Sequence, residues 1–488
     1  MKKISIDPIS RLEGHGRIDL FLKDDGELAN AYLVIPEIRG FEKFAEGRPV
    51  EEMPRITSRI CGVCPEAHHM AAAKACDAVW GVELPKTAKM IREMQYAAFF
   101  AGDHTTHFYA LGAPDFVVGP DAPAAERNLI GVIGKVGVEI GKQVIQMRKW
   151  SHEVAMLLGG KPVHPVNAIP GGVSRRVTPE MQKRLIEIGE FAVEFAQFSI
   201  KIVDDVVLAN KDYVNMIVGD DYTMKTYYMG LVDENNKSNF YDGKVRVVNQ
   251  QGEEFCKYEP KDYQKHIAEH VEPWSYLKFP YLKGVGWKGF VDGPESGVYQ
   301  ATPLSRMNAS DGFTTMLAQK EYERFYNTLG GKPVHHTLAT HWARVIEMLY
   351  AAERLLELAS HPDITGPDYR VIPTGTPTEG VGVVEAPRGT LTHHYKTDEN
   401  GIVTSANLIV GTTNNYAPMC MAIRGAAKGL ITKGSTVDDA TLNKIEMAFR
   451  SYDPCFGCAT HSLPGEMPMI VRVRSAEDGE VLDEVRRD

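Results

Sequence analysis

The sequence contains little cysteine and no long apolar run. Seven cysteines in 488 residues are too few for a disulfide scaffold, which is typical of small secreted domains. A bilayer-spanning helix needs about 20 consecutive apolar residues, and no stretch approaches that length, so we expect no direct membrane span. The opening residues MKKISIDPISRLEGHG lack the apolar core of a secretory signal, which favours a cytoplasmic protein.

Basic residues are in deficit as well. The chain has 54 lysines and arginines against 64 acidic residues, which gives a formal net charge of −10, and the acids are spread along its length. Nucleic acids and anionic membranes bind concentrated basic surfaces, so we expect neither as the main partner. With 43% hydrophobic and 24% charged residues, the composition is that of a globular protein and excludes collagen-like, coiled-coil and disordered chains.

The hydrophobic pattern predicts a mainly helical protein. The clearest helix covers 179–209, where Thr178 is a suitable N-cap, Pro179 suits the first helical position and apolar residues recur every three to four positions. A helix of this length is typical of a bundle core. Further helix-period segments cover 66–81, 85–111, 124–158, 310–328, 341–359, 418–430 and 437–450.

Strand patterns lie around this helical core. One hairpin is predicted before about residue 35, with the turn KDDGEL, and another runs from VGVVEAPRGTLTHHY through the turn DENG to IVTSANLIVGTT. The tail MPMIVRVRSAEDGEVLDEVRRD also predicts a hairpin. Residues 212–305 change composition and predict an irregular α/β insertion on the flank of the bundle. The expected fold class is therefore α+β and mainly α, with a long-helix bundle core, peripheral β-hairpins and this insertion.

Four of the cysteines form two C-x-x-C pairs about 390 residues apart, Cys61 with Cys64 and Cys455 with Cys458. Two such pairs supply four thiolates, a set that suits zinc, nickel, copper(I) or iron–sulfur ligation. Zinc ribbons space their pairs by about 15–20 residues, so this wide spacing favours a cleft of a folded core. A redox dithiol and coincidence remain open at this point. For Cys76, Cys256 and Cys420, which lie apart, we expect small buried apolar roles.

The residues that flank the two pairs narrow the choice among these kinds of site. The first pair lies in R-x-C-G-x-C-x-x-x-H at 59–68 and the second in D-P-C-x-x-C-x-x-H at 453–461. Together they closely resemble the two signatures of nickel–iron hydrogenase large subunits. Similar family segments are RLEGH at 11–15, RGFE at 39–42, DHTTHFY at 103–109 and EAPRG at 385–389. The resemblance implies the nickel–iron hydrogenase large-subunit fold, with 1–461 as one large catalytic domain that contains the insertion at 212–305.

The resemblance also implies the metal ligands. In that family four thiolates hold nickel, and two of them bridge to an iron that carries carbon monoxide and two cyanides. By motif position, Cys61 and Cys455 would be terminal nickel ligands, and Cys64 and Cys458 the bridges. His68 matches a histidine that hydrogen-bonds a bridging thiolate and tunes its donor strength. Without the resemblance, His68 would be taken as an ordinary polar residue.

Two charged side chains are implied to act beside this centre. Glu13 matches the glutamate that relays a proton away from Cys455; on its own it would be a surface or structural carboxylate. Arg388 matches the arginine over the open face of the metals, with Asp103 and Asp453 as the acidic residues around it. Taken alone, Arg388 suggests a salt bridge with Glu385 or a loop carboxylate, and Asp453 a turn residue.

Further positions are implied to hold the iron ligands and a second metal ion. Thr412, Pro387 and Arg388 fall where the family binds cyanide, although Gly411 occupies a position that is proline in many relatives. Oxygen atoms of Glu42 and the Leu408 carbonyl, with His461, fall where the family binds magnesium or another divalent ion. Many relatives are cleaved after the final motif histidine by a maturation endopeptidase, which here would remove the C-terminal extension 462–488.

The resemblance therefore implies the reversible oxidation of dihydrogen to protons and electrons at a buried nickel–iron centre. Because three scattered cysteines cannot build an iron–sulfur relay, we expect the partner to be an iron–sulfur small subunit, with further subunits that use flavin, NAD(P), ferredoxin or a heterodisulfide reductase. The segment at 54–75 is most similar to the soluble bidirectional branch. Two alternatives remain: a quinone-site subunit of the respiratory complex I kind, which lacks the metal cysteines, and a structural four-thiolate zinc protein.

Overall fold

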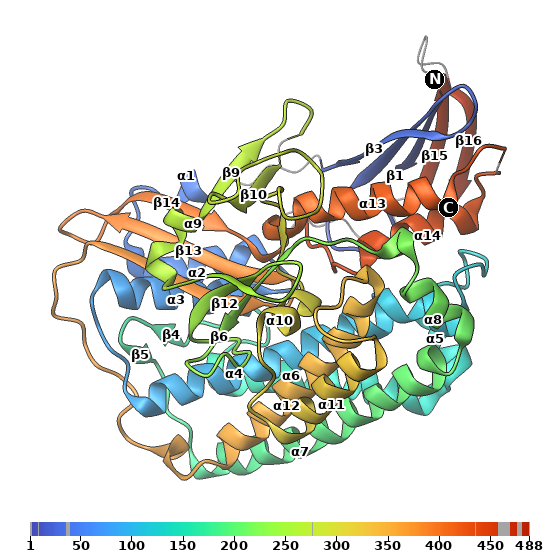
Figure 1. The fold of residues 1–488 in the computed structure, drawn as a ribbon. Helices are drawn as coiled ribbons and strands as arrows, with labels where there is room; N and C mark the ends of the chain where they lie inside the picture. Colours follow the sequence, from blue (N-terminus) through green and yellow to red (C-terminus); the bar gives the residue numbers. More distant parts are fainter. Residues whose placement is uncertain are drawn as a thin grey trace.

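The computed structural model describes residues 2–7, 9–35, 40–275, 277–434, 436–456, 469–475 and 481–487. Figure 1 shows a layer of long helices on one side and smaller sheets on the other. The helices are α1 (Phe41–Ala45), α2 (Met53–Thr57), α3 (Pro65–Val79), α4 (Lys86–Thr106), α5 (Leu129–Val136), α6 (Val138–Gly159), α7 (Pro179–Ile202), α8 (Lys211–Ile217), α9 (Tyr263–His266), α10 (Pro303–Ala309), α11 (Met316–Thr328), α12 (Thr340–Ser360), α13 (Tyr416–Leu430) and α14 (Asp439–Arg450).

The strands are mostly short and form several separate sheets. They are β1 (Lys2–Asp7), β2 (Arg17–Leu22), β3 (Leu28–Val34), β4 (Ala168–Ile169), β5 (Gly172–Val173), β6 (Tyr227–Val232), β7 (Lys244–Val248), β8 (Glu254–Tyr258), β9 (Ile267–Val271), β10 (Lys278–Leu282), β11 (Tyr299–Gln300), β12 (Glu379–Ala386), β13 (Gly389–Thr397), β14 (Val403–Ile409), β15 (Met469–Ser475) and β16 (Val481–Arg487). This content confirms the predicted α+β class.

The bundle is built on α12, which packs against both α4 and α7, while α6 packs on α4. Nearly every residue of α12 from Thr340 to Ala352 is buried, so the helix is enclosed around most of its circumference and lies in the core. Helix α7 instead buries one stripe, with Leu185, Ile188 and Phe195 facing inward. Its predicted cap is confirmed, because the Thr178 side chain accepts a hydrogen bond from the Met181 amide at 3.3 Å.

Three predicted helices differ from the structure at their ends or middle. The helix predicted over 179–209 leaves α-geometry after Ile202 and ends in a π-helical turn at Val203–Leu208. Helix α4 likewise continues into a π-helical segment at His107–Gly112. The helix predicted over 124–158 is two helices, because Gly137 takes a φ of 96° that a continuing α-helix cannot hold.

The N-terminal sheet joins both ends of the chain. Its strand order is β16-β15-β1-β2-β3, and every neighbouring pair is antiparallel. The predicted turn between β2 and β3 is confirmed, with Gly26 at a φ of 89°. The predicted C-terminal hairpin is confirmed as β15 and β16, and Figure 1 shows it side by side with the N-terminal strands.

The second predicted hairpin is confirmed at the turn DENG, where β13 and β14 pair antiparallel, but its first arm is wrong. The run VGVVEAPRGTLTHHY is not one strand but two, β12 and β13, and β14 completes a three-stranded antiparallel sheet. The chain reverses at Pro387 and Arg388, because Pro387 has no amide for the ladder and Gly389 takes a φ of 147°. A Cβ at Gly389 would lie 2.3 Å from the Gly411 carbonyl oxygen, so the turn also requires a residue without a side chain at this position.

The segment predicted as an insertion combines sheet and helix. It contains α8, the sheet β11-β6-β7-β8, the hairpin of β9 and β10, and α10. Its last helix is not peripheral, because α10 packs on α12 and on β6. Within the described residues, the helices include none long and apolar enough to cross a membrane.

Two glycines of strand β12 allow helix α3 to pack against it at very short distance. A Cβ on Gly382 would lie 2.2 Å from the Ala71 carbonyl oxygen, and one on Gly380 would lie 2.4 Å from the Ala75 carbonyl oxygen. Both glycines therefore allow the helix backbone to touch the strand, which a larger residue would prevent. The contact fixes the middle of α3, the helix that has Cys64 of the first C-x-x-C pair as its N-cap.

Candidate metal centre

Three thiols from opposite ends of the chain meet in the core. The Sγ atoms of Cys61, Cys64 and Cys455 all lie within 4.8 Å of one another. Cys61 Sγ is 2.8 Å from Cys64 Sγ and 3.4 Å from Cys455 Sγ. The three residues are 0%, 5% and 4% exposed. Among the described residues this is the group of metal-binding side chains that the fold brings together.

Local geometry explains why the first pair converges. Cys64 is the N-cap of α3 and Pro65 occupies its first position, so the chain turns sharply between the two cysteines. The amides of Val63 and Cys64 point at Cys61 Sγ, at 3.3 and 2.8 Å. Amide donors of this kind stabilise a thiolate and lower the cost of keeping it buried.

Cys455 of the second pair is held at this place by the N-terminal segment. The Phe456 amide donates to the Glu13 carbonyl at 2.9 Å, and the Glu13 amide donates to the Pro454 carbonyl at 3.4 Å. This short parallel bridge fixes Cys455 beside Glu13. Cys458 and His461 lie outside the described residues, so their predicted roles stay predictions.

Two predicted residues contact Cys455 directly. Its Sγ donates a hydrogen bond to Glu13 Oε2 at 3.1 Å, and its amide donates to Thr412 Oγ1 at 3.3 Å. Glu13 is half-buried, whereas Cys455 is buried, so the carboxylate connects the thiol to less enclosed space. The geometry is that of a proton acceptor at a thiol.

Arg388 lies between two buried carboxylates. Its Nη1 is 3.1 Å from Asp103 Oδ2 and its Nη2 is 3.0 Å from Asp453 Oδ2. Burial lowers the pKa of Arg388, but the attraction of Asp103 and Asp453, and of the thiolates of Cys455 and Cys64, outweighs it and holds the pKa well above its usual value. Arg388 is therefore a fixed positive charge whose field includes the sulfur atoms.

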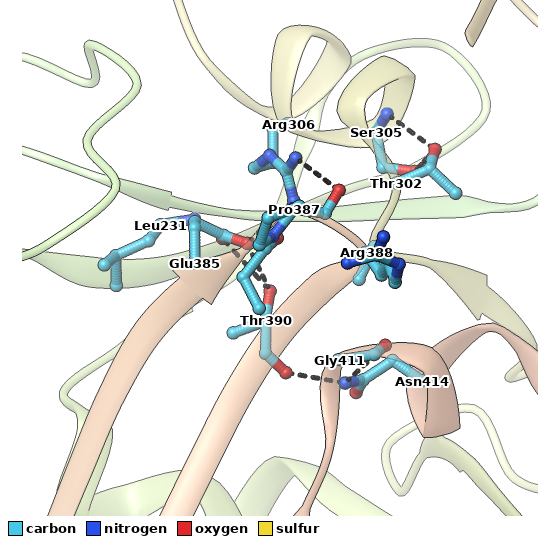
Figure 2. A network of polar contacts seen from close by, with 12 residues as sticks. Leu231, Thr302, Ser305, Arg306, Glu385, Pro387, Arg388, Thr390, Gly411 and Asn414 are labelled. Carbon is cyan, nitrogen blue, oxygen red and sulfur yellow. Dashed lines mark hydrogen bonds and ion pairs between the residues drawn. The ribbon is translucent and has the colours of Figure 1, made fainter. Parts of the chain in front are cut away.

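Of the two alternatives for Arg388, the pairing with Glu385 is wrong and the one with a loop carboxylate is confirmed, because Asp453 lies in the segment after α14. Glu385 instead accepts from the Leu231 amide at 2.6 Å and pairs with Arg306 at 3.2 Å. Burial raises the pKa of Glu385 to about 7, although Arg306 opposes the shift. Figure 2 shows the Glu385 and Arg388 side chains apart from each other, with no contact drawn between them.

His68 lies in a buried relay of aromatic polar groups. Its Nδ1 is 3.2 Å from His393 Nε2, and His393 Nδ1 is 2.7 Å from the Tyr395 hydroxyl. His68 lies one turn after Cys64 on α3, and His393 lies on β13. The partner histidine restricts the ring orientation and tautomer of His68.

The predicted divalent-ion residues are only partly described. Helix α1, which carries half-buried Glu42, packs on β14, which carries buried Leu408. The third residue, His461, is outside the described part of the chain. The magnesium site therefore stays a prediction.

Sequence reasoning missed several buried groups around the site. The most closely tied to it are Arg306, which binds the turn before Arg388; Glu347, which binds Arg306; and Asn415, whose Nδ2 donates to the Arg388 carbonyl at 2.7 Å. One signal was available for Glu347, because an acid inside the apolar run WARVIEMLYAA on a buried helix needs a cationic partner.

The donor set fits a soft transition metal. Buried thiolates gathered around a common point suit nickel, iron or zinc. Of the other described cysteines none joins them: Cys76 donates to the Val50 carbonyl at 3.0 Å, and burial raises the pKa of Cys420 to about 12. Cys256, expected to be buried, is only partly so, and its pKa is raised to about 11. The described site residues lie on α3 and just before it, on α4, in the turn between β12 and β13, and in the segments around Glu13, Thr412 and Cys455.

Comparison with known proteins gives a consistent result. A family model described as nickel-dependent hydrogenase matches residues 39–129 and 215–461, and one described as HoxL-like matches residues 3–38. An F420-non-reducing hydrogenase iron-sulfur subunit of Archaeoglobus profundus is 48% identical, with all of both chains covered. The beta subunit of the NAD-reducing hydrogenase HoxS of Cupriavidus necator is 38% identical, again over the full length of both chains.

Solved structures agree in fold. The structure of an NAD+-reducing [NiFe]-hydrogenase in the H2-reduced state superposes with a TM-score of 0.88 at 37% identity and covers 94% of this chain and 100% of that one. A Ni-Fe-Se hydrogenase from D. vulgaris Hildenborough superposes with a TM-score of 0.70 at 23% identity and covers 94% and 99% of the two chains, which shows likeness of fold alone.

Proposed function

The chain belongs to the nickel-dependent hydrogenase family, whose large, catalytic subunits it matches, and from this we propose that it oxidises dihydrogen reversibly at a nickel–iron centre bound in the described cleft. The observation that carries the proposal is the meeting of Cys61, Cys64 and Cys455 from both ends of the chain. These three thiolates, with Cys458, would hold the metals. When bound, the centre supplies the binding and heterolytic cleavage of dihydrogen, with carbon monoxide and cyanide as ligands of iron.

The protein's own part begins with the proton. Glu13 lies 3.1 Å from Cys455 Sγ, within the distance for direct proton transfer. A proton at that sulfur can pass to Glu13 Oε2 without any movement of the backbone. Because Glu13 is bridged to residues 454–456 by two backbone hydrogen bonds, the carboxylate and thiol keep this distance.

Arg388 supplies a fixed charge over the thiolates. Asp103 and Asp453 bind its two terminal nitrogens and so set the plane of the guanidinium. A preorganised charge in a buried site needs no reorientation when negative charge develops beside it. In this proposal Arg388, Pro387 and Thr412 also contact the cyanide ligands, and His68 tunes a bridging thiolate.

The electrons need a route out of the chain. The described cysteines outside the centre are scattered, which supports electron transfer to an iron–sulfur small subunit. Its docking surface is proposed at the groove of about 580 Å³ lined by α1 and α2, where Phe44 is exposed and Arg59 precedes Cys61 by two residues. Onward transfer to NAD(P), ferredoxin or a heterodisulfide reductase is proposed through further subunits, in line with the names of the relatives.

Several further assignments are proposals of the same kind. We assign residues 1–461 to one catalytic domain and 462–488 to an extension that a maturation endopeptidase would remove. Glu42, Leu408 and His461 would hold magnesium or another divalent ion. The proposed location is the cytoplasm.

The test is the metal content and infrared spectrum of the protein purified with its partner subunits. We expect nickel and iron together, and absorption from iron-bound carbon monoxide and cyanide. Cys455→Ser should abolish both dihydrogen turnover and nickel binding. Cys420→Ser is the matched control, because that thiol is buried but lies outside the cluster. Zinc alone would support the structural four-thiolate alternative, and protein without metal the quinone-site alternative; either would overturn the proposal.

A further inference from the structure

Arg306 is a buried arginine whose five N–H groups all have acceptors. Its side chain is 0% exposed and lies on the short helix α10. Nε and Nη2 bind the two oxygens of Glu347, each at 2.6 Å. Nη1 binds Glu385 Oε2 at 3.2 Å. Five satisfied donors in one plane fix the guanidinium in a single orientation.

The remaining donors of Arg306 bind backbone rather than side chains. Nη1 donates to the Ala386 carbonyl at 2.9 Å, and Nη2 donates to the Pro387 carbonyl at 3.2 Å. These are the two residues that directly precede Arg388. Figure 2 shows Arg306 above the turn, with its contact to the Pro387 carbonyl, and the Arg388 side chain projecting from the same turn.

The partners of Arg306 are themselves held. Glu347 lies on α12 and also contacts His104 Nε2 at 3.0 Å. Glu385 accepts from the Thr390 hydroxyl at 3.1 Å, from the other side of the turn. Arg306 therefore ties the turn to the bundle helix α12 on one side and to the sheet of β12 and β13 on the other.

The two residues of the turn, Pro387 and Arg388, take no part in the hydrogen-bond ladder between β12 and β13. Pro387 has no amide, and Arg388 lies outside both flanking strands. Behind the turn, Asn415 Nδ2 holds the Arg388 carbonyl at 2.7 Å. Arg306 in front and Asn415 behind are thus the side chains that fix the backbone from which Arg388 extends.

We propose that Arg306 is a positioning residue for Arg388: by binding the carbonyls of residues 386 and 387 it sets where the Arg388 guanidinium stands over the cysteine cluster. This rests on the proposed function of Arg388. An arginine is required because only its planar fork supplies donors to two carboxylates and two carbonyls at once. Lysine keeps the charge but has three donors and no fork.

The competing view is that Arg306 only stabilises the core as a buried ion pair. The chain offers a matched control for that role in Arg92. It is also 0% exposed, pairs with Asp77 at 2.6 Å and donates to the carbonyls of Ile169 and Gly172 at 2.7 and 2.8 Å. It lies eleven residues before Asp103 on α4, about 16 Å along the helix axis.

The first experiment measures backbone protection in the holoenzyme complex. In Arg306→Lys, hydrogen–deuterium exchange followed by mass spectrometry should be at least about tenfold faster in peptides that span residues 386–391, because the turn loses its carbonyl contacts. Arg92→Lys should leave those peptides unchanged. If Arg306→Lys does not yield folded complex, Glu347→Gln loosens the same guanidinium and should show the same acceleration. Unchanged exchange at the turn would overturn the proposal.

The second experiment asks whether Arg306 acts through Arg388. With a dye as electron acceptor, Arg306→Lys should lower kcat per bound nickel about 10- to 100-fold with KM for dihydrogen unchanged, while Arg92→Lys changes neither. In an Arg388→Lys background, Arg306→Lys should have almost no further effect. Additive losses would refute action through Arg388. If Arg388→Lys itself retains full turnover, the proposed function of Arg388 fails, and the exchange measurement alone decides the positioning role.

Discussion

Substituting Gly382 by alanine tests how the first cysteine pair is positioned. Strand β12 touches helix α3 at this residue, where an added Cβ would lie 2.2 Å from the Ala71 carbonyl oxygen and 2.4 Å from the Ala75 amide nitrogen. Contacts under 3.0 Å essentially never occur for real Cβ atoms, so helix and strand must separate by at least about 0.8 Å. Both neighbours are backbone atoms, which cannot rotate away as a side chain would.

The expected loss of stability follows from this overlap. Overpacking of a buried contact costs about 1–3 kcal/mol, and here the displaced element carries Cys64 at its N-cap. We expect Gly382→Ala to lower the free energy of unfolding in urea by that amount. Because the displacement moves Cys64 relative to Cys455, we also expect less nickel per chain after maturation.

Gly134 provides the control for the same chemical change. It lies in α5, is exposed, and has nothing within 4 Å of an added Cβ. Gly134→Ala should leave nickel content unchanged and raise stability by up to about 1 kcal/mol, because alanine favours a helix. If Gly382→Ala were as stable as Gly134→Ala and bound equal nickel, the tight contact between α3 and β12 would not position the cysteines.

Three further predictions concern the site and its surroundings. Glu13→Gln should lower dihydrogen turnover by at least about 100-fold with nickel content unchanged, since an amide cannot accept the proton from Cys455; turnover near the wild-type rate would refute the relay. Cys61→Ser should remove nickel, measured by elemental analysis, whereas Cys76→Ser should not, and equal losses would contradict the cluster. Burial lowers the pKa of His341 to about 3, so between about pH 6.5 and 3 the imidazole binds a proton in the unfolded protein but not in the folded one. The free energy of unfolding should therefore fall by about 1.4 kcal/mol per pH unit as the pH drops through this range. His341→Phe should flatten that pH dependence in urea titrations, and an unchanged slope would refute the role of His341.

The helical part of the fold could be predicted because its signals are local. Thr178 and Pro179 indicate the start of α7 from neighbouring residues alone. The three- to four-residue spacing of its apolar residues then identifies the buried face of the helix. The end of that helix could not be predicted. The π-helical turn at Val203–Leu208 arises in tertiary packing, and helix propensity does not distinguish it from a continued α-helix.

The centre was predictable for a different reason. The two C-x-x-C pairs carry chemistry that few buried residues share, so their joint presence indicates a common site whatever lies between them. The turn at Pro387 has a local signal that a prediction of one continuous strand overlooks, because Pro387 lacks an amide for the ladder and Gly389 suits a turn. No sequence motif identifies Arg306 as part of the site. Its partners Glu347 and Glu385 are 41 and 79 residues away, and two of its acceptors are backbone atoms.

The N-terminal sheet is completed by the C-terminal hairpin. With the C-terminal hairpin in place, β1 is an inner strand, paired with β15 on one side and β2 on the other. A chain that ends at residue 461 would lack β15, and β1 would become an edge strand with one row of backbone donors and acceptors open. Exposed edges accept strands from other chains. Removal of the tail would therefore leave β1 open to pairing with a strand of another chain.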